Sequence, residues 1–313
     1  MMDALAVANR PLHSKWRLKS HQIILLAMMI PGLLYFLLYQ YFPMYGILIA
    51  FKEFKIKKGI LGSPWAKPLF KNFAMFFQSP YCLQVLKNTV VISFLKIIAN
   101  TVASLGLAVL LSEVKVKWFK KGVQTITYLP HFLSWVIIFG VLYALCSESS
   151  GLINVMRRAG GKNSIPLLTN DQIFRILLIV SDVWKDAGWG AIIYLAAIAG
   201  IDPGLYEAAQ IDGANRIQRI RHVTLACIRP TIIIMIILRM GSVLDAGFDQ
   251  IYILYNSQVY STSDIIDTWV YRTGLEQMNY SVATAVGLFK SVLSMILVVS
   301  VNALARKWEE SLW

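Results

Sequence analysis

Six long apolar runs, separated by polar segments, constrain this chain more than any other feature of its sequence. They cover about residues 22–42, 86–111, 126–146, 173–200, 231–255 and 281–304. A transmembrane helix needs about 20 consecutive, mostly apolar residues. Because backbone groups inside a bilayer must find their hydrogen bonds within the protein, each run is expected to be helical. The sequence therefore predicts an all-α, polytopic membrane protein with about six transmembrane helices.

The composition agrees with a membrane protein and argues against other classes. Hydrophobic residues make up 57% of the chain, and its mean hydropathy is +0.59, whereas soluble domains are less apolar. The formal net charge of +13 raises the question of a nucleic-acid partner. The Lys and Arg residues are scattered between the apolar runs and form no basic face with stacking aromatics, so we expect no nucleic acid to bind. The three cysteines are widely spaced and indicate neither a disulfide framework nor a zinc site.

The apolar runs divide the chain into a transmembrane domain, residues 22–304, between an N-terminal tail of residues 1–21 and a C-terminal tail of residues 305–313. No small-residue cleavage site follows the first run, so we interpret it as a retained span rather than a signal peptide. With the N-terminus inside, the inner segments carry 14 Lys and Arg residues and the outer segments 10. This excess predicts that both tails are cytoplasmic. We find neither internal repeats nor discontinuous helices in the sequence.

The polar segment of residues 201–230 predicts a helix–turn–helix between the fourth and fifth runs. Asp202 is a good N-cap and Pro203 a good first helical residue, so a short helix is expected to begin there. Gly213 is expected to end this helix. Asp212 is expected to cap a second helix that runs on toward Pro230.

The same segment resembles the EAA loop of ABC-importer permeases. It contains Glu207-Ala208-Ala209, then Asp212-Gly213-Ala214. One departure from the family pattern is that Ala226 stands where a Pro is usual, which leaves only Pro230 near the end of the loop. Further stretches, among them Trp184-Lys185-Asp186-Ala187-Gly188 and Pro43-Met44-Tyr45-Gly46, are similar to sugar permeases of the polysaccharide and oligosaccharide type. The resemblance covers most of residues 30–313.

The resemblance implies a type I ABC-importer permease fold with a cytoplasmic coupling-helix loop at residues 201–230. It implies a second permease subunit, two ATP-binding subunits and an extracytoplasmic solute-binding protein as partners, in a bacterial cytoplasmic (inner) membrane. The cargo would be an oligosaccharide or polysaccharide. The residues expected to couple ATP hydrolysis to transport are Glu207, Ala208, Ala209, Asp212, Gly213 and Ala214.

Sequence motifs for catalysis and cofactor binding are missing from the chain. No phosphate-binding loop of the form G-x-x-x-x-G-K-[ST] occurs, so ATP and Mg²⁺ are expected on the partner ATPase subunits rather than here. The four histidines are dispersed along the chain, which argues against a metal site. We expect no enzyme activity, no catalytic residue and no cofactor in this subunit.

Ionisable and aromatic residues inside the apolar runs are candidates for the substrate path. Intramembrane charges are costly and mark either mutual pairing or a water-filled path. For Asp182, Lys185 and Asp186 an internal salt bridge is the simpler expectation, whereas Arg239 and Lys290 have no evident partner. These two cations leave room for acidic sugars such as uronate oligomers, for example alginate. The full set of path candidates is Trp184, Trp189, Tyr194, Arg239, Asp245, Asp249 and Lys290.

Two other classes of function compete with the importer. A secondary transporter would also place Asp and Lys in its spans, but it more often shows repeated halves and discontinuous helices. A non-transporting membrane scaffold would use the loop at 201–230 only to bind a partner.

Overall fold

The structure, a computed structural model, describes residues 20–306 of the chain. Within these residues the regular structure is helical, apart from one isolated antiparallel bridge between Lys52 and Trp65. This confirms the predicted all-α class. The chain divides into two compact units, residues 1–48 and residues 49–313. Most of the two predicted tails, 1–21 and 305–313, lies outside the described residues.

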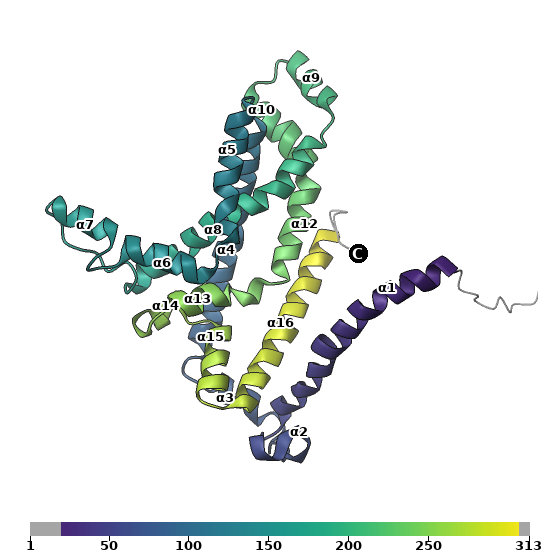
Figure 1. Cartoon of the computed structure of the whole chain (residues 1–313), viewed down its shortest axis with the longest axis vertical. Helices are drawn as coiled ribbons and strands as arrows, with labels where there is room; N and C mark the ends of the chain where they lie inside the picture. The colour runs from purple at the N-terminus through teal and green to yellow at the C-terminus, as the bar shows by residue number, and fades with distance from the viewer. Residues whose placement is uncertain (1–19, 307–313) are drawn as a thin grey trace, which may run out of the picture. The chain divides into compact units, whose positions relative to one another are not determined.

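Figure 1 shows the helices in chain order. The first unit contains α1 (Ser20–Phe36), the π-helix η1 (Leu37–Tyr41) and most of the 3-10 helix η2 (Phe42–Phe51). The second unit continues with η3 (Ile56–Lys58), α2 (Gly59–Gly62), α3 (Lys71–Phe77), α4 (Cys82–Ser112), α5 (Lys117–Tyr128), η4 (Leu129–Phe132), α6 (Trp135–Cys146), α7 (Leu152–Ala159) and α8 (Asp171–Ala199). Its later helices are α9 (Pro203–Ile211), α10 (Arg216–Arg219), η5 (Ile220–Thr224), α11 (Leu225–Cys227), α12 (Arg229–Met240), η6 (Val243–Asp245), α13 (Phe248–Leu254), η7 (Ser257–Val259), α14 (Tyr260–Ser263), α15 (Ile266–Tyr271), η8 (Arg272–Glu276) and α16 (Tyr280–Arg306).

The helices that are long and apolar enough to cross a membrane agree with the predicted count. In the described residues three stretches qualify outright: Ile24–Phe51, Cys82–Ser112 and Tyr280–Leu304. Three bent helix pairs raise the number to six when each pair is counted as one span. In the first unit the apolar side chains are exposed around the whole helix, for example Met28 at 74% and Leu34 at 51%. A helix that is apolar on all sides belongs in lipid or against another membrane helix.

The long helices α4 and α8 form the central contact of the second unit, and small residues let them approach closely. A Cβ atom at Gly190 on α8 would stand only 2.5 Å from the Ser104 hydroxyl on α4. A Cβ at Gly188 would stand 2.0 Å from the Thr127 carbonyl oxygen on α5. Larger residues at either position would force these helices apart, which is why small residues favour helix packing in membranes.

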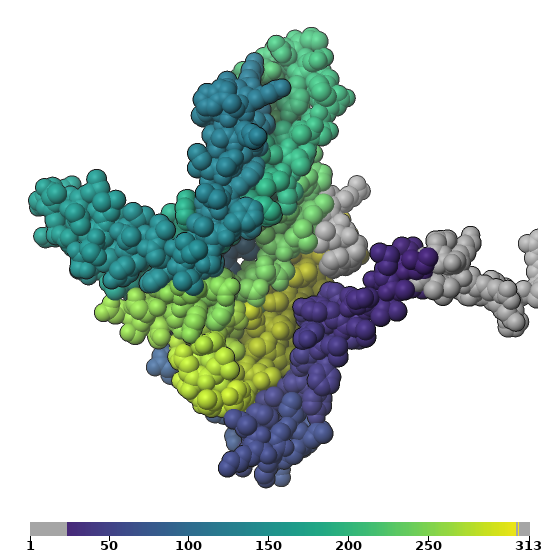
Figure 2. Space-filling view, viewed as in Figure 1, coloured from purple at the N-terminus to yellow at the C-terminus, as the bar shows by residue number. Residues whose placement is uncertain are grey.

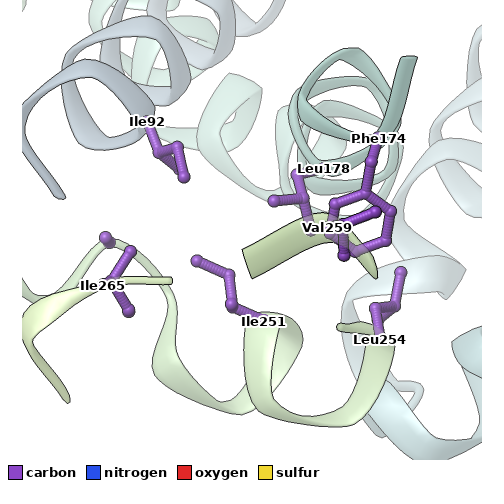
Figure 3. Close-up of a cluster of buried hydrophobic side chains, with 8 residues drawn as sticks. Ile92, Phe174, Leu178, Ile251, Leu254, Val259 and Ile265 are labelled. Atoms are coloured by element: carbon purple, nitrogen blue, oxygen red, sulfur yellow. The ribbon is translucent and has the colours of Figure 1, made fainter. Parts of the chain in front are cut away.

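A buried apolar cluster ties α13 to these long helices (Figure 3). Its members come from four regions of the chain and point toward one another: Ile92, Phe174, Leu178, Ile251, Leu254, Val259 and Ile265. A second cluster, centred on Phe76, Ile266, Trp269 and Val286, holds α3, α15 and α16 together. Each fully buried side chain of this size contributes about 1.5–3 kcal/mol to folding.

Two of the predicted spans are interrupted, which corrects the expectation of continuous helices. The run 126–146 bends by 106° between η4 and α6, where Pro130 ends the first helix and the Ser134 hydroxyl accepts a bond from the Ile137 amide to cap the next. The run 231–255 stops at Met240 and resumes at Phe248. Ala246 and Gly247 between these helices have φ values of 48° and 81°, a left-handed conformation that no helix continues through. Hydropathy alone does not reveal such breaks, because apolar residues flank them on both sides.

Candidate functional site

The loop at 201–230 begins with the helix predicted for it. The Asp202 carboxylate accepts a hydrogen bond from the Gly204 amide at 2.9 Å and so caps α9. Gly213 has a φ of +76° and ends this helix as predicted. The Asp212 amide donates to the Ala208 carbonyl at 3.0 Å, and the Ala214 amide donates to the Ala209 carbonyl at 2.9 Å. These bonds satisfy carbonyl groups in the last turn of α9.

The second helix of the loop is capped differently from the prediction. Asp212 lies at the C-terminal end of α9, and Asn215 caps α10 through a capping box with Gln218. The expectation that Asp212 caps the second helix is therefore wrong, because the left-handed Gly213 and the two residues after it separate Asp212 from that helix. The helix then continues through η5 and α11 and bends by 59° before α12.

Two side-chain contacts fix the loop, one within it and one to the rest of the second unit. The Tyr206 hydroxyl on α9 shares a hydrogen bond of 3.0 Å with the Thr224 hydroxyl on η5. The Arg216 guanidinium on α10 donates to the Glu113 carboxylate, just after α4, at 2.8 Å. Since α12 follows the loop directly, the loop is connected to both α4 and α12.

The tip of the loop offers an exposed surface that combines charge with apolar side chains. Glu207, Ala208, Asp212 and Gly213 are exposed, and Ala209 and Ala214 are half-buried. Ile211 is 86% exposed and Ile217 is 76% exposed, so apolar side chains lie beside the charged ones. Among residues 20–306 the Glu207 side chain has no hydrogen-bond or ion-pair partner. In Figure 2 this segment stands at one end of the second unit.

A second polar site lies between α4, α8 and the break after α12. The Lys96 ammonium is buried, lies 3.3 Å from the Asp182 carboxylate, and donates to the Ala246 carbonyl at 2.9 Å and to the Gln250 side chain. Asn100 also donates to Asp182. These bonds fix the left-handed break, since the ammonium binds the carbonyl that the interrupted helix leaves free.

A cavity of about 110 Å³ opens beside this network, lined by Lys96, Asn100, Asp182, Arg239 and Ser242 among others. The Arg239 guanidinium lies beside Gly190, is half-buried, and makes no hydrogen bond or ion pair within the described residues. Four buried polar side-chain atoms also lack a hydrogen-bond partner within the described residues. They belong to Ser93, Asn100, Thr101 and Ser104. Unsatisfied buried groups are costly, so a cluster of them is a place where a polar ligand or water gains the most.

The remaining path candidates separate into three environments. Trp184 and Trp189 are 48% and 45% exposed, whereas Tyr194 is only 2% exposed and packs in an apolar cluster with Ala108 and Ala191. Asp249 is exposed at the start of α13. Only Arg239 of the seven candidates lines the cavity.

Lys290 is fully engaged with carboxylates, although the sequence showed no evident partner for it. Its ammonium binds Asp245 at 2.6 Å and Asp267 at 2.7 Å. Burial raises the pKa of the Asp267 carboxyl, although the Lys290 ammonium acts in the opposite direction. Asp245, Asp267 and Lys290 therefore form a structural ion cluster that joins η6, α15 and α16.

The internal salt bridge expected among Asp182, Lys185 and Asp186 is wrong. Lys185 instead donates to the carbonyls of Pro130, His131 and Leu133, and the Asp186 carboxylate binds the His131 ring at 2.8 Å. His131 in turn stacks on Trp189 at 4.5 Å. The break at 133–134 exposes carbonyls that attract the lysine, and that break was not predicted.

Sequence reasoning also missed three polar or aromatic residues that follow the break after α12. They are Gln250, Tyr252 and Tyr271. Gln250 is completely buried and bonds to α8 through the Leu178 carbonyl and the Ser181 hydroxyl, each at 2.8 Å. A signal for the aromatic residues was present, because Phe248, Tyr252 and Tyr255 follow the spacing of one helix face.

A family profile matches most of the chain. The family is described as binding-protein-dependent transport system inner membrane component, and its profile covers residues 100–310. The chain is 43% identical to the polygalacturonan/rhamnogalacturonan transport system permease protein YteP of Bacillus subtilis (strain 168) over 289 residues. That match covers 92% of this chain and 89% of the relative.

Solved structures of similar fold include a bacterial ABC transporter involved in the import of the acidic polysaccharide alginate. One of its chains matches with a TM-score of 0.85 and 39% identity, over 92% of this chain and 96% of that chain. A structure of the bacterial alginate ABC transporter in complex with an alginate pentasaccharide-bound periplasmic protein matches with a TM-score of 0.85 and 38% identity. Here 93% of this chain and 96% of that chain are covered.

The buried network predicts a clear effect of Lys96→Met on stability. This change leaves the Asp182 carboxylate, 14% exposed, without its cation, and breaking such a buried pair costs about 3–5 kcal/mol. We expect a lower unfolding temperature of the purified protein in detergent, and partial recovery when Asp182→Asn is added. Lys87→Met, at an exposed position on the same helix, is the control and should change little. Equal stability of Lys96→Met and the wild type would contradict the assignment.

Proposed function

Since the chain belongs to the family of binding-protein-dependent transport system inner membrane components and is the permease subunit of an ABC importer, we propose that it moves acidic oligosaccharides. Family membership confirms the resemblance inferred from the loop at 201–230. It also sets aside the secondary transporter and the non-transporting scaffold as readings of this chain.

The observation that carries the proposed substrate is the Arg239 guanidinium in the cavity between α4, α8 and α12. The other cations of this region, Lys96 and Lys290, are neutralised by carboxylates, whereas Arg239 has no such partner among residues 20–306. A guanidinium binds carboxylates through paired, charge-assisted hydrogen bonds. A uronate carboxylate would satisfy it, in line with the substrates that the similar alginate and polygalacturonan transporters are named for.

The partners follow from what this chain lacks and what it exposes. It carries no phosphate-binding loop, so two separate ATPase subunits would bind ATP and Mg²⁺. A second permease would complete the path, and an extracytoplasmic binding protein would deliver the glycan. The exposed tip of α9, with Glu207 and Ile211, is the surface that we assign to the ATPase, because small residues beside a charge permit close docking.

Coupling then has a short mechanical route through this subunit. A movement of α9 passes to η5 through the Tyr206–Thr224 bond and to the end of α4 through the Arg216–Glu113 pair. The same backbone continues into α12, whose last turn carries Arg239. Transport requires an element with two arrangements that contacts its partner differently in each, and we assign this role to α9 to α12.

The first test concerns the docking of α9. We expect Glu207→Lys and Gly213→Pro to leave the protein inserted in the membrane while reducing both co-purification of the ATPase subunits and glycan uptake. Gly213 is affected because proline cannot adopt its positive φ. Lys57→Glu, a charge reversal at an exposed lysine outside this loop, is the matched control. Normal uptake by the well-expressed double variant Glu207→Lys/Gly213→Pro would refute the coupling role.

The second test concerns topology, for which we propose that both termini and the loop at 201–230 are cytoplasmic. In a background without the three native cysteines, Ile217→Cys and Gln258→Cys each introduce one exposed thiol. A membrane-impermeant maleimide applied to intact spheroplasts should label position 258 and miss position 217. Labelling in the reverse pattern would overturn the proposed orientation.

The third test concerns the substrate. In the reconstituted complex, Arg239→Gln should weaken ATPase stimulation by oligogalacturonate and alginate oligosaccharides about 10- to 100-fold, the value of a hydrogen bond to a charged group. Stimulation by a neutral glycan such as maltopentaose, where it occurs, should remain. Arg239→Lys should retain part of the preference.

Lys290→Gln serves as the comparison for that test. Its ammonium binds Asp245 and Asp267, so this change should lower the thermal stability of the protein. The ratio of ATPase stimulation by acidic glycans to ATPase stimulation by neutral glycans should stay the same. Equal loss for acidic and neutral glycans in Arg239→Gln would remove the argument for an acidic substrate.

A further inference from the structure

Five aromatic rings of the second unit form an unbroken chain, which we call the aromatic ladder: Phe248, Tyr252, Tyr255, Tyr260 and Tyr271. Phe248 stacks on Tyr252 with ring centroids 5.4 Å apart, and Tyr271 contacts both, at 5.9 and 4.6 Å. From Tyr252 the chain continues to Tyr255 at 6.0 Å and from there to Tyr260 at 4.9 Å. The rings come from α13, α14 and α15, so the fold gathers them from separate segments.

The ladder connects the polar cavity with the pockets at its other end. Phe248 directly follows Gly247, which lines the cavity that also contains Arg239. At the opposite end Tyr260 and Arg272 line a pocket of about 500 Å³, and Tyr255 lines another of about 540 Å³. The two ends of the ladder therefore lie near different openings, the large pockets at one end and the small polar cavity at the other.

Arg272 places a positive charge at the outer end of the ladder. Its guanidinium lies 4.8 Å from the centre of the Tyr260 ring and binds the buried Asp264 carboxylate at 2.5 Å. Burial alone would lower the pKa of Arg272, but the Asp264 carboxylate outweighs this effect and the pKa is raised. The pair is close to neutral, so it adds little net charge to the outer end of the ladder.

The two sides of α13 differ in burial, and the ladder lies on the more exposed one. Ile251 and Leu254 on one face are 0% and 4% exposed and belong to the apolar cluster. Phe248, Tyr252 and Tyr255 on the other face are only half-buried. The exposed face of α16, by contrast, carries aliphatic residues such as Met295 and Val299. Tyrosine suits an environment that is apolar on the ring face and wet at the hydroxyl.

We propose that the aromatic ladder is a glycan-binding surface, on which successive sugar rings of an oligosaccharide stack as it moves from the outer pocket to the Arg239 cavity. The inference rests on the proposed function, and it adds the residues on which the successive sugar rings would stack. The C–H faces of a sugar ring pack against the aromatic faces, and the tyrosine hydroxyls bond to sugar hydroxyls. Several rings in a row match a linear oligosaccharide, and they bear no charge of their own.

The test compares glycans of different length in the reconstituted complex with its binding protein. Tyr252→Ala and Tyr271→Ala each remove one ring, and should reduce uptake of alginate pentasaccharide about 2- to 10-fold, the range that one aromatic contact supports. Uptake of the alginate disaccharide should fall less, since it spans fewer rings. Tyr252→Phe keeps the ring and should stay close to the wild type. Tyr39→Ala, which breaks a Tyr35–Tyr39 contact of 5.0 Å on η1, is the matched control and should have no effect.

Basal ATPase activity and thermal stability separate a glycan surface from packing. Equal losses for both glycan lengths, in step with a lower unfolding temperature, would overturn the proposal, as would wild-type uptake by the Tyr252→Ala/Tyr271→Ala double variant. If the wild-type complex takes up maltopentaose but no acidic glycan, the acidic substrate is refuted. The ladder is then tested by the same comparison, with maltopentaose as the long glycan and maltose as the short one. Uptake of no glycan by the wild type would refute both proposals.

Discussion

The ion pair of Lys96 and Asp182 is the contact on which the interior of this subunit depends. It joins α4 to α8, and the same ammonium binds the Ala246 carbonyl at the break between α12 and α13. A buried charge that loses its partner is strongly destabilising, so these bonds keep the three segments joined. That arrangement brings α12 and the small cavity next to the two longest helices of the second unit.

The position of α12 explains how one short loop reaches the interior. Arg229 begins this helix directly after the loop, and Arg239 lies in its last turn. The 59° bend at the start of α12 and the left-handed residues after it isolate the helix from its neighbours in the chain. A helix that is bounded by two breaks moves as a unit more readily than one embedded in a continuous span.

The sequence predicted the all-α class, the number of spans and the helix at the loop, because each depends on local patterns such as hydropathy, Asp202 and Gly213. It did not predict the breaks at 133–134 and 241–247, since apolar residues flank both of them. The charge partners followed from those breaks. Lys185 binds carbonyls that the first break exposes, and Lys96 binds one at the second. Pairings between segments about 150 residues apart are set by tertiary packing, which no local pattern records.

The distribution of charge along the proposed path bears on how a glycan would move. Among the described residues, Arg272 at the outer end and Lys290 near the inner end are paired with carboxylates, and the rings between the two pockets are uncharged. Movement along a path needs binding that is favourable enough to admit the ligand and weak enough to release it. A row of fixed cations would hold a polyanion, whereas stacking contacts are nearly equivalent from one ring to the next. In the proposed path, Arg239 would bind the carboxylate at a single point, and a movement of α12 would withdraw the guanidinium and release the sugar.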